Sequence, residues 1–387
     1  MFDIKETDKK YVANTYNRFP VEIVEGKGAL MYDKDGKRYI DMGTGIGVTA
    51  FGINDDKWTE AVCDQLKKVQ HTSNLYYTEP CARLAKLLCE KTGYKKVFFG
   101  NSGAEANECA IKIARKYAQE KKGEDYYTII TLKNSFHGRT LTTLSATGQD
   151  HFHKLFNPLT PGFVHAEANN FEELKKLALE NKTAGIIMEA VQGEGGVNPL
   201  DADFVKKTAE FAKENDIILI MDEVQTGNGR TGKLYGYMNF DIIPDVVTTA
   251  KGLGGGLPIG AVLMSEKVEN VLGFGDHGST FGGNPVCCAG AISVIERIDE
   301  ELLSDVRKKS EYIFDELQNA DGVESVTGMG LMIGIKTKKP AGEVVKECME
   351  KGVLCLTAKD KVRLLPPLNI PMDLLKEAID TIKSSLE

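Results

Sequence analysis

Short apolar runs without alternating polar residues constrain the fold of this chain more than any other feature. Segments with helical spacing separate these runs along the sequence. Strands that are buried on both faces have this composition, and strands joined by helices form mostly parallel sheets. We therefore expect an α/β fold in which helices cover both faces of a mostly parallel sheet. The runs are Lys96–Phe99, Thr128–Leu132, Ala184–Met188, Ile217–Met221 and Asp245–Thr249.

Two of the separating segments, Ala104–Gln119 and Asp203–Glu214, have clear helical spacing. Their apolar residues recur every three or four positions, which places them on one face of a helix. We predict a helix in each segment. The residues on the two faces are Ala106, Cys109, Ala110, Ile113 and Ala114 in the first, and Phe204, Val205, Thr208, Phe211 and Ala212 in the second.

The length of 387 residues exceeds what one ordinary hydrophobic core supports. We expect residues 49–284 to form the large α/β domain and residues 285–387 to form a smaller α+β domain. Residues 1–48 are expected to join the smaller domain, with a hairpin over Gly28–Met42 that turns at Asp35-Gly36. In the smaller domain we predict strands at Val323–Thr327, Leu331–Lys336, Val353–Leu356 and Val362–Leu365, and helices at Ala289–Ile298, Leu302–Leu317, Ala341–Lys351 and Met372–Leu386.

Charge and cysteine spacing narrow the class of protein. A net charge of -8 makes nucleic acid an unexpected partner. The eight cysteines form no C-x-x-C pair, which favours reduced thiols in a reducing compartment, and we expect a cytoplasmic protein. The first ten residues are too polar for a signal peptide, and no apolar run approaches the length of about 20 residues that spans a bilayer.

Polar residues follow three of the predicted strands, at the edge of the sheet where ligands bind in such folds. Gly100–Glu108 leads into a helix whose first N–H groups suit an anion, although a plain helix cap has the same sequence. Asp222 ends an apolar run, where a carboxylate needs a partner, either a ligand or a structural salt bridge. Lys251 follows the last strand, and burial would lower its pKa and make it a nucleophile.

The glycines after Lys251, in A-K-G-L-G-G-G-L-P-I-G-A, allow a solvated loop, a phosphate-binding loop or a close approach to a ligand. The lysine precedes the glycines and the run leads into another strand, so neither a P-loop nor a dinucleotide-binding motif fits. Taken together, an anion site, a carboxylate and an amine match the phosphate, the ring nitrogen and the aldehyde of pyridoxal 5′-phosphate.

Seven sequence blocks, in the same order, resemble those of class III aminotransferases of fold type I over nearly the whole chain. This resemblance implies a large domain with a mostly parallel sheet, a smaller α+β domain and pyridoxal 5′-phosphate as cofactor. The blocks are residues 16–21, 98–112, 136–148, 191–197, 221–232, 250–261 and 277–285.

The resemblance also implies which residues hold the cofactor. Lys251 would form the Schiff base and move the proton, and Asp222 would pair with the ring nitrogen. Ser279 and Thr280 would reach the site of a neighbouring subunit, Ser279 near the substrate and Thr280 near the phosphate, which makes the working unit a homodimer with shared sites. The other cofactor residues would be Ser102, Gly103 and Ala104 at the phosphate, Phe136 and Val224 on the two ring faces, and Gln225 near the ring hydroxyl.

Two arginines and two further residues are implied in substrate binding. Arg139 would hold the α-carboxylate of N2-acetyl-L-ornithine or the distal carboxylate of glutamate, and Arg363 the glutamate α-carboxylate. Glu194 would cover Arg363 when the acylated substrate is bound, and the apolar Ile46 would leave room for an acyl group. The implied reaction moves the δ-amino group of N2-acetyl-L-ornithine to 2-oxoglutarate, giving N-acetyl-L-glutamate 5-semialdehyde and L-glutamate.

Other readings of the sequence stay open at this point. Ornithine, succinylornithine, N-acyl-diaminopimelate or 4-aminobutyrate are alternative amine donors, and an aminomutase or a cofactor-free scaffold are alternative functions. We interpret His137 and His277 as loop supports, His151 and His153 as surface residues rather than metal ligands, and Cys287-Cys288 as a buried, reduced pair. Ala104, Gly52–Asp55, Ala190 and Asn228 depart from the residues that are common in the family.

Overall fold

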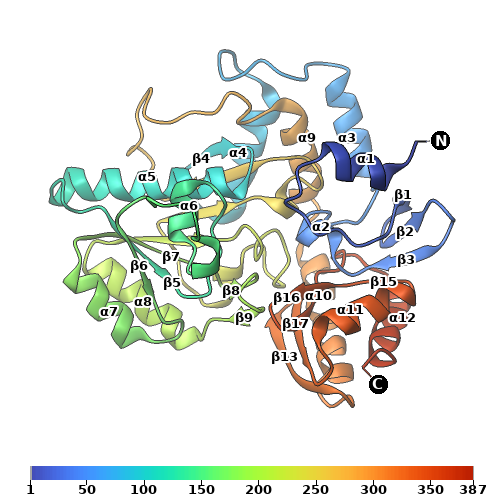
Figure 1. Cartoon of the computed structure of the whole chain (residues 1–387). Coiled ribbons are helices and arrows are strands. Elements are labelled where there is room, and N and C mark those ends of the chain that lie inside the picture. Colours follow the sequence, from blue (N-terminus) through green and yellow to red (C-terminus); the bar gives the residue numbers. More distant parts are fainter. Residues whose placement is uncertain (1, 387) are drawn as a thin grey trace.

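A seven-stranded sheet forms the centre of the computed structural model, which describes residues 2–386 (Figure 1). The strand order is β4-β12-β11-β10-β7-β5-β6, and six strands run in the same direction while β12 runs opposite to them. The expected mostly parallel sheet is therefore confirmed. Its strands are β4 (Lys96–Gly100), β5 (Thr128–Leu132), β6 (Phe163–Ala166), β7 (Thr183–Met188), β10 (Ile218–Asp222), β11 (Val246–Thr249) and β12 (Gly260–Met264).

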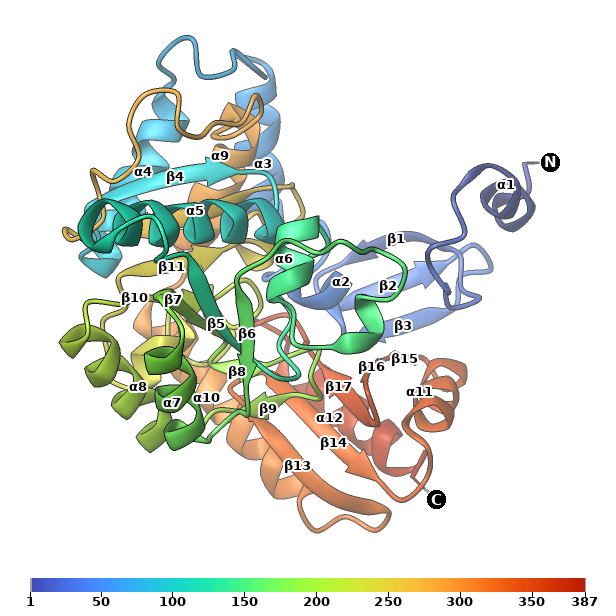
Figure 2. The ribbon, with the colours of Figure 1, turned by 60° about the vertical axis from the view of Figure 1, so that its left-hand side comes forward.

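The apolar runs form strands because both faces of this sheet are covered (Figure 2). In β10, Ile218 and Ile220 pack into a core with helix α5 (Gly103–Lys122), whereas Leu219 and Met221 pack into the core that contains α7 (Phe171–Glu180) and α8 (Ala202–Glu214). A polar residue on either face of the sheet would be buried. The strands therefore do not alternate between apolar and polar residues. The predicted helices Ala104–Gln119 and Asp203–Glu214 correspond to α5 and α8.

Strand β6 is the one strand of the large sheet that the sequence did not predict. It lies at the edge, pairs with β5 alone, and three of its four residues are half-buried. An edge strand needs no continuous apolar run, so His165 is tolerated there and interrupts the pattern.

The C-terminal part contains a four-stranded antiparallel sheet of order β13-β14-β17-β16. Its strands are β13 (Val323–Met329), β14 (Met332–Thr337), β16 (Leu356–Ala358) and β17 (Lys361–Leu364). The nearby helices are α9 (Pro285–Ile295), α10 (Glu300–Leu317), α11 (Ala341–Glu350) and α12 (Met372–Lys383), close to the predicted ranges. Cys287 and Cys288 are buried in α9 as free cysteines, as expected.

The prediction of one strand over Val353–Leu356 is wrong, because the chain changes sheets at Cys355. The short strand β15 (Val353–Leu354) pairs in parallel with β3 (Arg38–Asp41), whereas Leu356 in β16 pairs with Arg363 in β17. Continuous apolar character hid this break, since Val353 and Cys355 are both buried. The structure thus has two small sheets where the sequence suggested one.

The N-terminal sheet consists of β1 (Ile23–Lys27), β2 (Leu30–Asp33), β3 and β15. The predicted hairpin joins β2 to β3, and Gly36 adopts the left-handed φ of 79° at its turn. Figure 1 shows this N-terminal sheet beside the C-terminal elements. The division at residues 48 and 284 stays a prediction. Within residues 2–386 no helix is long and apolar enough to cross a membrane.

The remaining elements are short or lie at the periphery. They are the helices α1 (Ile4–Tyr11), α2 (Thr44–Gly47), α3 (Asp56–Leu66), α4 (Glu79–Thr92) and α6 (Leu141–Ala146), the 3-10 turns η1 (Asp150–Phe152), η2 (Gly236–Asn239) and η3 (Lys251–Leu253), and the strands β8 (Val191–Gln192) and β9 (Asn198–Pro199).

Candidate active site

A cavity of about 430 Å³ lies at the carboxyl edge of the large sheet. Residues that follow β4, β5, β7, β10 and β11 line it, together with the segment that leads into β12. The edge is the one that the sequence singled out, and the volume is in the range of pockets that bind small molecules.

Lys251 follows β11 after one intervening residue, Ala250, and lies at the wall of this cavity. Its backbone has a left-handed φ of 45°, and within residues 2–386 its amine has no hydrogen-bond partner. Asn228 supports the preceding residues, because its Nδ2 donates to Thr249 Oγ1 (3.0 Å) and to the carbonyl oxygen of Ala250 (3.2 Å). Burial lowers the pKa of the Lys251 amine, more than the neighbouring Glu194 carboxylate raises it. A lysine in this state is a usable nucleophile and base.

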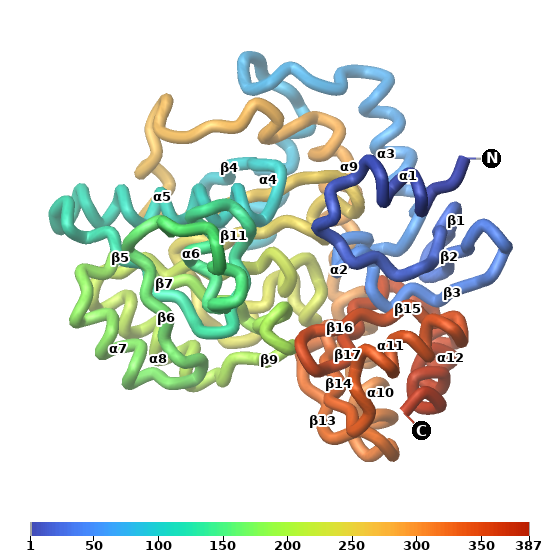
Figure 3. Tube along the Cα trace, in the orientation of Figure 1, coloured from blue at the N-terminus to red at the C-terminus, as the bar shows by residue number. Residues whose placement is uncertain are grey.

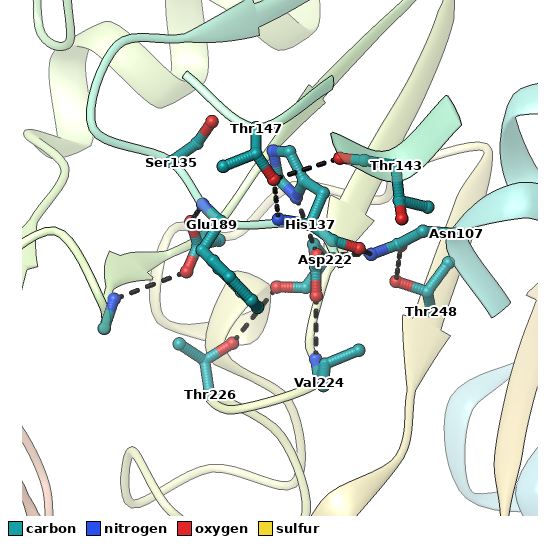
Figure 4. Close-up of polar contacts among 12 residues, drawn as sticks. Asn107, Ser135, His137, Thr143, Thr147, Glu189, Asp222, Val224, Thr226 and Thr248 are labelled. Atoms are coloured by element: carbon teal, nitrogen blue, oxygen red, sulfur yellow. Dashed lines mark hydrogen bonds and ion pairs between the residues drawn. The ribbon is translucent and has the colours of Figure 1, made fainter. Parts of the chain in front are cut away.

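Asp222 is held by three donors at the end of β10 (Figure 4). Its Oδ2 accepts from Asn107 Nδ2 and from His137 Nδ1, both at 2.7 Å, and its Oδ1 accepts from the backbone N–H of Val224 at 3.0 Å. Asn107 in turn donates to the carbonyl oxygen of His137 and accepts from the Thr248 hydroxyl. The carboxylate is therefore fixed in place and buried at the base of the cavity.

His137 is more than the loop support that the sequence suggested. Its side chain is buried against Asp222, and its backbone N–H donates to Thr147 Oγ1 at 3.0 Å (Figure 4). Burial acts to lower the pKa of His137, but the hydrogen bond and the charge of Asp222 outweigh burial and raise it. A charged imidazole here forms an ion pair with the Asp222 carboxylate, with Nδ1 2.7 Å from Oδ2.

The start of α5 forms an anion site on one side of the cavity. Ser102 caps the helix, with its Oγ accepting from the backbone N–H of Glu105 at 3.2 Å. Within the described chain, the N–H groups of Gly103 and Ala104 have no partner, and both residues line the cavity. A Cβ on Gly103 would lie 2.6 Å from Val224 Cγ1, so glycine is needed for this close approach.

Glu189 follows β7 in the cavity and was not identified from the sequence as a site residue. It accepts from the backbone N–H groups of Phe136 (2.9 Å) and Gly193 (3.3 Å), and so ties together two loops of the site. Burial raises its pKa to about 7, against the opposing charge of His137. Its position after a buried strand, like that of Asp222, was the available signal.

Arg363 reaches toward the cavity from β17 of the C-terminal sheet. Its Nη1 donates to Glu194 Oε1 at 2.6 Å and to Gln225 Oε1 at 3.3 Å, and Gln225 Nε2 donates to Glu194 Oε1 at 3.2 Å. Burial acts to raise the pKa of Glu194, but the charge and hydrogen bond of Arg363, together with Lys251 and Gln225, outweigh burial and lower it. The three residues form one polar cluster in which Arg363 is buried.

Arg139 lines another part of the cavity and is exposed. Its guanidinium carbon lies 4.1 Å from the ring centroid of Phe152 and 5.3 Å from that of Phe136. Among residues 2–386 it forms no ion pair, in contrast to Arg363. Its N–H groups are thus open to a ligand in the cavity.

Arg363 contacts the lining residues Glu194 and Gln225 without lining the cavity itself, and three further predicted site residues also lie outside the lining. Ser279 Oγ accepts from Asn101 Nδ2 and from the N–H of Gly282, each at 3.0 Å, and Thr280 is exposed beside it. Ile46 is 42% exposed and outside the cavity, which Val48 lines instead. The roles assigned to these three residues stay predictions.

The chemistry of the cavity fits pyridoxal 5′-phosphate. Two free N–H groups at a helix start suit the phosphate, a fixed carboxylate suits the protonated ring nitrogen, and a free amine of lowered pKa suits the aldehyde. Phe136 and Val224 also line the space between these groups.

Comparison with known proteins identifies the family. A family model described as "Aminotransferase class-III" matches residues 11–386. The chain is 49% identical to the acetylornithine aminotransferase of Haemophilus ducreyi, covering 99% of this chain and 98% of that protein. The chain therefore belongs to the class III aminotransferases.

Solved structures agree with this assignment. An ornithine aminotransferase from Toxoplasma gondii, described with partial occupancy of PLP at its active site, matches with a TM-score of 0.94 at 31% identity, covering 99% of this chain and 93% of that one. The acetylornithine aminotransferase of Elizabethkingia anophelis matches with a TM-score of 0.88 at 30% identity, covering 99% and 97%. The fold is the fold-type I arrangement that the sequence resemblance implied.

Proposed function

We propose that this enzyme transfers the δ-amino group of N2-acetyl-L-ornithine to 2-oxoglutarate, giving N-acetyl-L-glutamate 5-semialdehyde and L-glutamate. The observation that carries the proposal is the pair of arginines around Lys251. One arginine is neutralised by Glu194 and the other is open to a carboxylate. The relative at 49% identity is an acetylornithine aminotransferase, which favours this donor over ornithine.

Pyridoxal 5′-phosphate would be held by Lys251, Asp222 and the start of α5. When bound, this cofactor accepts the electron pair that is left on the substrate carbon after a proton is removed. Asp222 supplies the negative charge that keeps the ring nitrogen protonated, and the hydrogen bonds from His137 and Asn107 hold it in place. Lys251 carries the proton between substrate and cofactor, since its lowered pKa makes a neutral amine accessible.

The remaining proposed cofactor contacts are with residues that line the cavity. Ser102, Gly103 and Ala104 would take the phosphate, Phe136 and Val224 the two ring faces, and Gln225 the ring hydroxyl. Gln225 also donates to Glu194, so the same side chain touches the cofactor side and the substrate side of the site.

The two arginines explain how one cavity takes two substrates. Arg139 would bind the α-carboxylate of N2-acetyl-L-ornithine or the distal carboxylate of glutamate, because its donors are free in both cases. Arg363 would bind the α-carboxylate of glutamate once Glu194 gives way. With the acylated substrate no second carboxylate is present, and Glu194 stays on Arg363 as in this structure.

The working unit would be a homodimer in which Ser279 and Thr280 complete the neighbouring site. Asn74 Nδ2 donates to the carbonyl oxygens of Ser279 (3.0 Å) and Gly282 (2.9 Å), which joins two surface loops that lie side by side in Figure 3. Large apolar residues are exposed on both loops, as expected of a surface that a second copy covers. They are Leu75, Tyr76 and Tyr77 on one loop, and Phe274 and Phe281 on the other.

We also propose the division into residues 1–48, 49–284 and 285–387, in which the first segment joins the last through the pairing of β3 with β15. Ile46 would lie near the acyl group of the substrate.

The free cysteines favour a reducing compartment, and we propose the cytoplasm.

A steady-state assay with and without 2-oxoglutarate tests the reaction class. We expect turnover of N2-acetyl-L-ornithine only when 2-oxoglutarate is present, with L-glutamate formed in equal amount. Continued conversion of the amine substrate without 2-oxoglutarate, beyond one equivalent per active site, would instead indicate an aminomutase and would overturn the proposal.

A further inference from the structure

Arg139 is held in the cavity by aromatic rings alone. Its guanidinium carbon is 4.1 Å from the Phe152 centroid, closer than the 5.3 Å to Phe136. No hydrogen bond or ion pair from its guanidinium is formed with any of residues 2–386. Arg363, by contrast, is buried and fixed by Glu194 and Gln225.

An aromatic ring is well suited to hold an arginine that must stay open. A long, exposed side chain samples many rotamers unless a neighbour restrains it. A carboxylate neighbour would restrain Arg139 but would also compete with the substrate carboxylate for the same N–H groups. A ring face restrains the planar guanidinium by stacking and leaves its in-plane donors free.

Phe152 is itself fixed by contacts with the rest of the site. It lies in η1, where its N–H donates to the carbonyl oxygen of Gln149 at 3.0 Å. The turn is anchored by His153, whose Nε2 contacts the carbonyl oxygens of Leu144 (3.0 Å) and Thr147 (2.8 Å). The Phe152 ring also meets the Phe136 ring edge to face, with centroids 5.8 Å apart. The ring under Arg139 therefore has a defined place.

We propose that Phe152 is a positioning residue that holds Arg139 ready for substrate carboxylates. This inference rests on the proposed role of Arg139 in both half-reactions. It assigns Phe152 no contact with substrate or cofactor, and its effect on substrate binding passes through Arg139 rather than through the neighbouring Phe136. The binding of both carboxylate-bearing substrates should then depend on Phe152, whereas the rate of the chemical step should not.

The first measurement compares Phe152→Leu and Phe152→Tyr in the holoenzyme. Loss of the ring should raise the KM for N2-acetyl-L-ornithine and for L-glutamate about three- to tenfold, with kcat changed by less than about twofold. Tyrosine keeps the ring face and should restore both KM values. A fall in kcat with unchanged KM, or no recovery with tyrosine, would overturn the inference.

The second measurement uses glutarate, a dicarboxylate without an amino group, and follows its binding to the holoenzyme by calorimetry. Phe152→Leu should weaken glutarate binding about three- to tenfold. In an Arg139→Ala background the same change should have no further effect, because the contact has already been removed. Additive losses in the double variant would contradict a role through Arg139.

Phe163→Leu serves as the matched control for Phe152→Leu. Phe163→Leu removes a ring that lies 5.1 Å from the guanidinium carbon of Arg115, away from the cavity, and should leave glutarate binding unchanged. If Arg139→Ala weakens glutarate binding but Phe152→Leu does not, the inference fails and the proposed function stands. If Arg139→Ala has no effect, the proposed role of Arg139 fails, and the inference fails with it.

Discussion

Arg363 Nη1 lies 2.6 Å from Glu194 Oε1, and this pair joins the C-terminal sheet to the turn between β8 and β9. Arg363 is buried, whereas the Glu194 side chain is 29% exposed at the cavity. The carboxylate can therefore move away without unfolding its surroundings, while the arginine stays fixed. This asymmetry makes Glu194 the movable partner in our account of how one site accepts two substrates.

Glu194→Gln should favour glutamate. A neutral amide binds Arg363 less strongly than a carboxylate, so the α-carboxylate of glutamate displaces it more easily. We expect the Kd of the holoenzyme for L-glutamate, from single-turnover titrations, to fall about three- to tenfold. The Kd for N2-acetyl-L-ornithine should not fall. A weaker affinity for glutamate in this variant would show that Glu194 does not compete with the substrate carboxylate for Arg363.

Lys251→Ala should remove the base and the covalent anchor of the cofactor. Turnover should fall by about 10²- to 10⁴-fold, the range of a lost acid–base group. Borohydride reduction followed by mass spectrometry should find the cofactor attached to the wild type and absent from the variant. Lys133→Ala is the control, because its amine pairs with Glu167 on the surface, and it should retain activity. Full activity of the Lys251 variant would contradict the site assignment.

Glu189 should make stability depend on pH. Its pKa is about 7 in the folded chain and about 4.5 for an ordinary glutamate, so between these values the folded state binds a proton that the unfolded state has released. The contribution of Glu189 to stability therefore falls as pH rises through this window. Relative to Glu189→Gln, the Tm of the wild type without cofactor should fall by roughly 2–5 °C between about pH 5 and 7. Parallel Tm profiles for the two proteins would indicate that Glu189 is already ionised throughout.

The sequence located the site because its main groups follow apolar runs. Lys251 is the second residue after β11, and Asp222 is the last residue of β10. Both strands are fully buried, and such strands are the easiest elements to recognise in a sequence. The contact of His137 with Asp222 was not predictable in the same way, because the residues are 85 positions apart. The strand order brings the two residues together. Only β7 separates β5 from β10 in the sheet, and His137, in the loop after β5, reaches Asp222 at the end of β10.

Two other features were hidden because each depends on a contact with a distant segment. Asn228 had no local signal, since its effect on Lys251 passes through a hydrogen bond to the carbonyl oxygen of Ala250. The change of sheet at Cys355 was masked by continuous apolar character on both sides. In both cases the determinant is a contact with a distant segment rather than a local pattern, as for the pairing of β15 with β3.

The most direct test of the account is a single-turnover comparison of amine donors. The holoenzyme is mixed separately with N2-acetyl-L-ornithine, N2-succinyl-L-ornithine, L-ornithine and 4-aminobutyrate, and the loss of visible absorption of the aldehyde form of the cofactor is followed. We predict the largest ratio of rate to Kd for N2-acetyl-L-ornithine, at least about tenfold above ornithine and 4-aminobutyrate. A larger ratio for N2-succinyl-L-ornithine, L-ornithine or 4-aminobutyrate would contradict the proposed function.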